Sequence, residues 1–124
     1  MKICITSQGN TLQSQVDPRF GRCAYFIFID TETMEFEAVA NNQAQAMGGA
    51  GVQSGQLIAG KEVSTVLTGN VGPNAYQTLK AGGIEIITGV SGQVNDVVEK
   101  YKKGEYKSTS GPSVESHFGM KNPQ

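Results

Sequence analysis

The chain's two arginines lie three positions apart, among groups with which they could bind an anion. Arg19 and Arg22 occupy a polar stretch that also contains Asp17 and leads into Cys23. A guanidinium group offers forked donors and does not lose its proton, so the two arginines are candidate anchors for an anionic ligand. Arg19 could instead pair with Asp17 to hold a turn while Arg22 is solvated, and both interpretations can hold together.

Glycine clusters form a second group of candidates. Residues 48–51 read Gly-Gly-Ala-Gly and residues 69–73 read Gly-Asn-Val-Gly-Pro, each before a predicted helix. Free N–H groups at a helix N-terminus can bind an anion, and glycine lets a ligand approach the backbone closely. We therefore expect ligand contact at these clusters, whereas Gly82 and Gly83 are interpreted as the end of a helix.

Soft metal ligands are few. Cys4 lies within a predicted strand, where we expect a buried, unreactive thiol. Cys23 is expected at the start of a strand beside Arg22, whose charge would favour the thiolate. Cys23 and the one histidine, His117, are the candidate metal contacts, although a solvated side chain is the alternative for His117 in its polar tail.

Carboxylates are scarce where the ligand site is expected. Between Asn41 and Leu79 the only charged residues are Lys61 and Glu62, and Asp17 is the one acidic residue predicted near the arginines. A two-metal nuclease needs several carboxylates around its ions. The sequence therefore disfavours an enzyme of nucleotide or phosphate-ester chemistry.

These groups must be positioned by elements in the order βββαβαβα. Hydrophobic patterning predicts strands at residues 2–7, 23–30, 35–40, 62–68 and 84–88, and helices near 50–60, 73–80 and 94–101. Residues 8–22 show no apolar period, so we expect a mobile loop there and a flexible tail over 107–124.

The element order predicts a five-stranded mixed sheet with three helices. Tight connections make the second strand antiparallel, and right-handed crossovers give the strand order 3-2-1-4-5, a ribonuclease H-like arrangement. A flavodoxin-like fold would need a helix within residues 8–22, where Pro18 and Gly21 disfavour one. The predicted topology brings residues 17–22 and three helix N-termini, near Gly51, Gly72 and Gly92, to one edge of the sheet.

Length and charge limit the function further. The chain has 124 residues and a formal net charge of −1, which suits one domain over residues 1–106 and gives no broad field for nucleic acid. It has no apolar run of about 20 residues, so no membrane span is expected. With two cysteines and no CxxC pattern, a reducing cytoplasm is the expected location.

The motifs taken together resemble those of the dinitrogenase iron–molybdenum cofactor biosynthesis family, which includes NifX and the C-terminal domain of NifB. The resemblance covers residues 1–103 and rests on the order and spacing of five segments. These are Asp-Pro-Arg-Phe-Gly-Arg at 17–22, an apolar strand ending at Asp30, Gly-Gly-Ala-Gly at 48–51, Thr-Gly-Asn-Val-Gly-Pro-Asn-Ala at 68–75, and Gly-Ile-Glu-Ile at 83–86. Unlike dedicated nitrogenase carriers, this chain is expected to lack an additional domain.

The resemblance implies a ribonuclease H-like fold and a non-catalytic carrier of iron–molybdenum cofactor or its iron–sulfur precursor. The implied partners are proteins that donate and accept the cluster, and the chain is expected to be a monomer or a weak dimer. Carried over by motif, the cofactor-binding residues would be Arg19, Phe20, Gly21, Arg22, Gly48, Gly49, Gly51, Gly69, Asn70 and Gly72. A protein-interaction or regulatory module without a ligand is the main alternative, and a phosphate-ester enzyme is the other.

Overall fold

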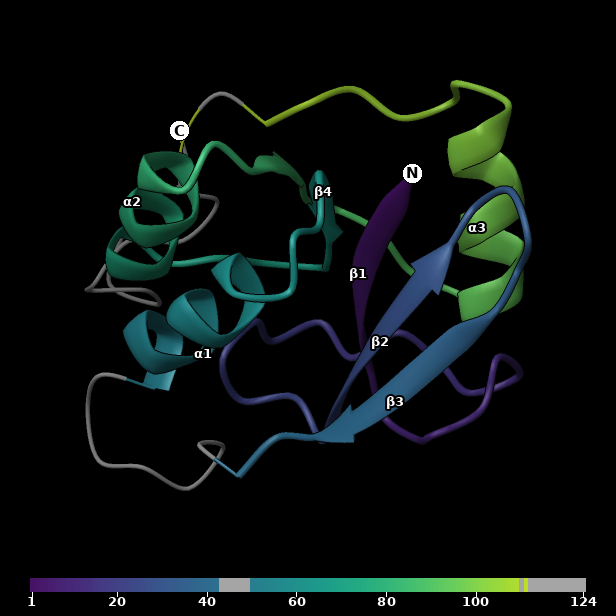
Figure 1. The fold of residues 1–124 in the computed structure, drawn as a ribbon, viewed down its shortest axis with the longest axis horizontal. Helices are drawn as coiled ribbons and strands as arrows, with labels where there is room; N and C mark the ends of the chain where they lie inside the picture. The colour runs from purple at the N-terminus through teal and green to yellow at the C-terminus, as the bar shows by residue number, and fades with distance from the viewer. Residues whose placement is uncertain (43–49, 110, 112–124) are drawn as a thin grey trace, which may run out of the picture.

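One sheet lies between two helices on one face and a third helix on the other (Figure 1). The computed structural model describes residues 1–42, 50–109 and 111. The strands are β1 (Lys2–Ser7), β2 (Tyr25–Asp30), β3 (Phe36–Ala40), β4 (Thr65–Leu67) and β5 (Glu85–Ile87). The helices are α1 (Ala50–Ala59), α2 (Pro73–Ala81) and α3 (Val94–Lys102).

The sheet confirms the predicted topology. Its strand order is β3-β2-β1-β4-β5. β2 is antiparallel to β1 and β3, whereas β4 is parallel to β1 and β5. The strand bounds differ from those predicted, because β2 begins at Tyr25 and β4 and β5 have only three residues each. Before β4, Glu62 has a φ of 62°, a left-handed conformation that does not fit a strand.

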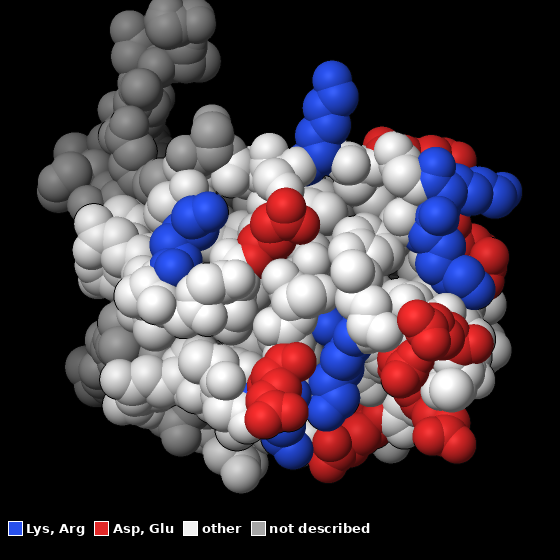
Figure 2. Space-filling model, turned by 45° about the horizontal axis from the view of Figure 1, so that its top comes forward, with Lys and Arg blue, Asp and Glu red and all other residues white. Residues whose placement is uncertain are grey.

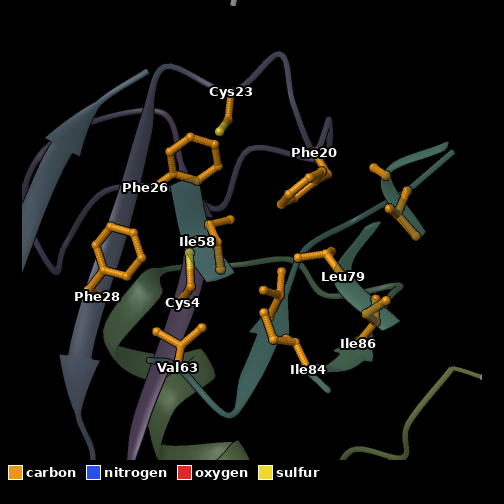
Figure 3. Packing of buried hydrophobic residues seen from close by; sticks show 13 residues of the cluster. Cys4, Phe20, Cys23, Phe26, Phe28, Ile58, Val63, Leu79, Ile84 and Ile86 are labelled. Carbon is orange, nitrogen blue, oxygen red and sulfur yellow. The ribbon is translucent and has the colours of Figure 1, made fainter. Parts of the chain in front are cut away.

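Alternation along the central strands divides the core between the two faces of the sheet. The cluster facing α1 and α2 includes Cys4, Phe26, Phe28, Ile58 and Leu79, shown in Figure 3. The cluster facing α3 includes Ile3, Ile5, Ile27, Val94 and Val97. Both faces of β1 and β2 are therefore covered, which explains why these strands are apolar at nearly every position.

The segment between β1 and β2 is docked against the sheet. Val16 and Phe20 are 6% and 8% exposed. The Val16 N–H donates to the Gly92 carbonyl at 2.8 Å, and the Asp17 N–H donates to the Thr6 carbonyl at 2.9 Å. The expectation that residues 8–22 cannot bury enough apolar surface to be ordered is therefore wrong. These contacts join residues far apart in the chain, so they leave no periodic pattern in the sequence.

Only the beginning of the predicted C-terminal tail is described, as residues 107–109 and 111. Within it, the N–H of Thr109 donates to the Ile86 carbonyl at 2.6 Å. The prediction of flexibility over the rest of 107–124 lies outside the described residues.

Helix length bears on the expected absence of a membrane span. Among the described residues, no helix is long and apolar enough to cross a bilayer. The longest described helix, α1, has ten residues.

Native-state amide exchange tests the docking of the β1–β2 segment. We expect the amides of Val16 and Asp17 to exchange at least about 100-fold more slowly than in the unfolded chain, because both amides donate hydrogen bonds and both residues are buried. Exchange followed by NMR, with the urea-unfolded chain as reference, measures this protection. Exchange of both amides at the unfolded rate would contradict the docked segment.

Candidate functional site

Two segments that are far apart in sequence meet at the carboxyl end of the parallel strands. Arg19 and Asn70 form an isolated parallel bridge. The Phe20 N–H donates to the Asn70 carbonyl at 3.1 Å, and the Asn70 N–H donates to the Pro18 carbonyl at 2.7 Å. The arginine-containing segment and the glycine-rich segment before α2 therefore share one edge, as the predicted topology requires.

Gly69 permits this close approach. A Cβ atom added at Gly69 would lie 2.6 Å from the Cα of Pro18 and 2.9 Å from its carbonyl oxygen. Both distances are shorter than a side chain allows, and the backbone atoms concerned cannot rotate away. Gly69 was expected to admit a ligand, but the space beside its Cα is filled by Pro18. The structure thus gives this glycine a packing role.

Asp17 and Arg19 form a forked ion pair. The Nε and Nη2 atoms of Arg19 donate to Oδ1 and Oδ2 of Asp17, each at 3.2 Å, and the Arg19 backbone N–H donates to Oδ1 at 3.1 Å. The Asp17 side chain is 2% exposed, whereas that of Arg19 is 65% exposed. The hydrogen bonds and the charge of Asp17 raise the pKa of Arg19 above its usual value. A buried carboxylate therefore holds one edge of the guanidinium and leaves the remainder facing solvent.

Two threonines anchor the backbone beneath this ion pair. The Thr6 hydroxyl donates to the Asp17 carbonyl at 2.7 Å and lies 2.7 Å from the hydroxyl of Thr68. Both threonine side chains are fully buried. Buried hydroxyls need hydrogen-bonding partners, and here they tie the loop to the ends of β1 and β4. Sequence analysis missed these two residues; the available signal is a threonine at the end of each of two adjacent parallel strands.

Asn41 holds the next turn of the loop. Its Nδ2 donates to the carbonyl oxygens of Gly21 and Cys23, at 3.1 and 2.9 Å. Gly21 has a φ of 90°, a conformation that glycine adopts without strain. Asn41 directly follows β3, so this contact fastens the turn at residues 21–23 to the end of that strand. Sequence analysis missed Asn41 as well, and no pattern around it indicates the contact.

Phe20 and Arg22 differ in their exposure. The ring centroid of Phe20 lies 5.9 Å from that of Phe26. Phe20 is buried, and Figure 3 shows its ring among the apolar side chains of this cluster. Arg22 is exposed, and its backbone N–H donates to the Arg19 carbonyl at 3.2 Å. Of these two predicted site residues, Phe20 anchors the loop by packing into the core, whereas Arg22 is exposed.

Cys23 is not the accessible thiolate that the sequence suggested. It lies before β2 and its side chain is fully buried. Burial, with the nearby charge of Asp17 as a second cause, raises the pKa of the Cys23 thiol to about 12. The expectation that Arg22 would favour the thiolate is wrong, because desolvation dominates. Burial also raises the pKa of Cys4, as expected for an unreactive core thiol.

The helix N-termini at this edge are not equivalent. Gly72 is the N-cap of α2 and makes no side-chain cap hydrogen bond, and Pro73 begins the helix. The amides of Asn74 and Ala75 have no acceptor within the helix, and of these two residues Asn74 is exposed whereas Ala75 is buried. At α3, in contrast, the N–H groups of Val94 and Asn95 donate to loop carbonyls at 2.9 and 2.8 Å. The prediction that three N-termini are open is wrong for α3.

The remaining predicted residues are only partly described. Gly51 lies in the first turn of α1, and Asn70 is exposed beside Gly69. Gly48, Gly49 and His117 lie outside the described residues. Within the described part of the chain, no three His, Cys, Asp or Glu side chains form a group that could hold a metal ion.

Comparison with known proteins places most of this chain in one family model. A model described as dinitrogenase iron-molybdenum cofactor matches residues 1–104. An uncharacterized protein of Methanocaldococcus jannaschii is 30% identical over 107 residues, which cover 84% of this chain and 87% of that protein.

Two solved structures are similar over nearly the whole chain. The apo form of the orange protein from Desulfovibrio gigas matches with a TM-score of 0.86 and 38% identity, covering 90% of this chain and 94% of that one. A Thermotoga protein assigned as NifB matches with a TM-score of 0.76 and 36% identity, covering 86% and 91%.

A double-mutant cycle tests the Asp17–Arg19 pair. We expect Arg19→Gln to lower the free energy of unfolding by about 1–3 kcal/mol, because it leaves a buried carboxylate without its guanidinium partner. In the Asp17→Asn background the same change should cost much less. Urea unfolding of the four proteins measures both effects. Equal costs in the two backgrounds would show that the ion pair does not stabilise the fold.

The buried thiols predict a fall in stability at alkaline pH. A Cys23 pKa of about 12 in the folded chain lies above the value of 9.0 for a free thiol. The folded form therefore keeps its proton where the unfolded form loses it, and the stabilisation is full below pH 9 and lost as pH rises toward 12. We expect Cys23 to contribute a loss of about 1 kcal/mol between pH 8 and pH 10. Urea unfolding should show a smaller decline in Cys23→Ala, whereas an identical decline would place the titration elsewhere.

Proposed function

Because the chain belongs to the dinitrogenase iron–molybdenum cofactor family, we propose that it is a non-catalytic carrier of iron–molybdenum cofactor or a related iron–sulfur cluster precursor. Family membership over residues 1–104 supports this proposal, as does the similarity to the orange protein and to the NifB-assigned protein. The cluster is the cargo of the carrier.

The observation that carries the proposal is that the loop bearing the exposed guanidinium of Arg19 is bridged to the segment that leads into α2. The Arg19–Asn70 bridge brings it to the segment that leads into Gly72. The first turn of α2 contains no acidic residue. A cationic group and free amides therefore face the same edge, an arrangement that suits an anionic cluster whose metals already carry sulfide ligands.

Neither cysteine is placed to bind a cluster permanently, which suits a protein that binds its cargo reversibly. Both cysteines are buried, with their pKa values raised, so neither is presented as a thiolate ligand. Stable iron–sulfur sites normally use cysteine thiolates. A carrier must release its cargo, and charge-assisted hydrogen bonds from Arg19, Arg22 and the α2 amides can be exchanged for those of an acceptor protein.

The proposal extends to the location, the oligomeric state and the partners of the chain. We assign the chain to the cytoplasm, as a monomer or weak dimer that receives a cluster from one protein and delivers it to another. The face in Figure 2 carries acidic and basic side chains side by side, which supports protein partners over nucleic acid. The strand order supports placing the fold among ribonuclease H-like folds.

Anaerobic titration with isolated iron–molybdenum cofactor tests the carrier function. Changing Asp17→Asn and Arg19→Gln together removes one charge of each sign, so the net charge is unchanged. We expect this pair to weaken binding by about 10- to 100-fold relative to Asp17→Asn alone, which keeps the guanidinium. Arg22→Gln should weaken binding in the same direction.

The double change Lys100→Gln and Lys103→Gln is the control. It removes two exposed cations at the C-terminal end of α3, which lies away from the edge of the sheet that carries Arg19. These changes should leave the affinity within about twofold. Absence of binding by the parent chain would refute the carrier function and favour a ligand-independent module. Binding by the parent that is unchanged both in the Asp17→Asn/Arg19→Gln pair and in Arg22→Gln would place the cargo elsewhere.

A further inference from the structure

The turn that carries Arg22 is held through its backbone. Gly21 and Cys23, on either side of Arg22, are buried, whereas Arg22 is exposed. The Arg22 N–H donates to the Arg19 carbonyl at 3.2 Å, which closes the turn. The Cys23 side chain lies in the same apolar cluster as Phe26, and Figure 3 shows both. The Cα of Arg22 is therefore held between two buried neighbours.

One side chain bonds the carbonyls on both sides of Arg22. The Nδ2 group of Asn41 donates to the carbonyl oxygens of Gly21 and Cys23 at 3.1 and 2.9 Å. A side-chain amide has two N–H donors, so one Asn41 can serve both carbonyls. The Gly21 carbonyl and the Arg22 N–H belong to one peptide group, and that N–H is bonded to Arg19. This peptide group is therefore fixed on both sides.

Asn41 is itself fixed by the sheet. It directly follows β3, and its N–H donates to the Ala24 carbonyl at 2.9 Å, which continues the pairing of β2 with β3. Its exposure is only 9%. Without the Asn41 amide, the carbonyls of Gly21 and Cys23 would lose a donor in a buried place, which costs free energy. The pairing of β2 with β3 thus determines where Arg22 lies.

The two arginines are held in two separate ways. Arg19 is held through its side chain, by the carboxylate of Asp17 at 3.2 Å. Arg22 is held through its backbone, by Asn41. Disorder that must be removed on binding lowers affinity, so an anion that contacts both guanidinium groups is bound more tightly when both segments are fixed beforehand. A buried amide beneath Arg22 can therefore contribute to affinity without touching the ligand.

We propose that Asn41 is a positioning residue of the cargo site, which acts through Arg22 and does not contact the cargo. This inference rests on the proposed carrier function. Its specific content is that the contribution of Asn41 to cargo affinity requires the Arg22 guanidinium. An asparagine that only stabilised the fold would contribute equally with and without that guanidinium.

A double-mutant cycle in the full chain tests this inference, with isolated iron–molybdenum cofactor as the anaerobic probe. Asn41→Ala removes the amide, and we expect it to weaken binding by about five- to tenfold in the parent chain. In the Arg22→Gln background the same change should weaken binding by less than about twofold. In the Asp17→Asn/Arg19→Gln background, which keeps Arg22, the full effect of Asn41→Ala should persist.

Amide exchange of Arg22 gives a second readout that needs no cargo. We expect this exchange to be about tenfold faster in Asn41→Ala than in the parent, because the turn loses the bonds that hold it. Asn41→Ser, which keeps one donor, is the second variant if urea unfolding shows that Asn41→Ala does not fold.

Thr31→Val is the matched control. It removes a buried hydroxyl that donates to the Met1 carbonyl at 3.3 Å, at the opposite end of β2 from Cys23. This change should lower the free energy of unfolding, but it should leave both the cofactor affinity and the Arg22 exchange rate within about twofold of the parent.

The outcomes separate this inference from the carrier function. If the parent binds the cofactor and Asn41→Ala weakens binding equally with and without the Arg22 guanidinium, Asn41 acts only through the fold and the inference is wrong. Binding by Asn41→Ala as tight as that of the parent, or an unchanged rate of Arg22 exchange, would also overturn it. Absence of binding by the parent would refute the carrier function and this inference with it.

Discussion

The buried hydrogen-bonded junction at the ends of β1 and β4 is the constraint on which the site depends. Thr6 and Thr68 are fully buried, and Asp17 is 2% exposed. Each polar group placed there must be satisfied within the protein, and leaving one unpaired would cost free energy. The Thr6 hydroxyl meets this need by bonding the Asp17 carbonyl, and the Asp17 carboxylate does so by bonding Arg19. The position of the arginine is therefore a consequence of satisfying the buried end of the sheet.

That constraint gives most residues of the motif at 17–22 a structural role. Asp17 is buried, Phe20 packs into the core, and Gly21 has a positive φ. These three residues therefore determine the path of the loop. Pro18, Arg19 and Arg22 are the exposed residues of this motif, and the two arginines are its exposed charged groups. Gly69 belongs to the same structure, because only glycine lets Pro18 approach this closely. Residues grouped by sequence as one binding edge thus separate into those that hold the loop in place and those that are exposed to solvent.

The sequence predicted the topology well and the site less well, for one physical reason. The alternation of helices and strands determines the sheet order, and each element carries its own local period. The loop before β2 is held by bonds such as that from Val16 to Gly92, which depend on the assembled sheet and leave no local pattern. Cys23 illustrates the same difficulty, since its neighbour Arg22 suggested a low pKa whereas its burial in the fold sets a high one. The hydrogen bonds from the N-terminal amides of α3 to loop carbonyls could not be predicted from the sequence for the same reason.

Two of the irregular segments of the described chain are held in a similar way, one at the site and one at the edge of the sheet. Arg19 pairs with Asn70 beyond the end of β4, and Thr109 pairs with the outer side of β5. In each case a short stretch of backbone forms a strand-like bond without becoming a strand. Such a bond fixes a segment at little cost in ordered residues, since only the bridging residue must adopt an extended conformation. A small sheet whose β4 and β5 have only three residues each can therefore hold the arginine-bearing loop at one end and the segment after α3 at its side.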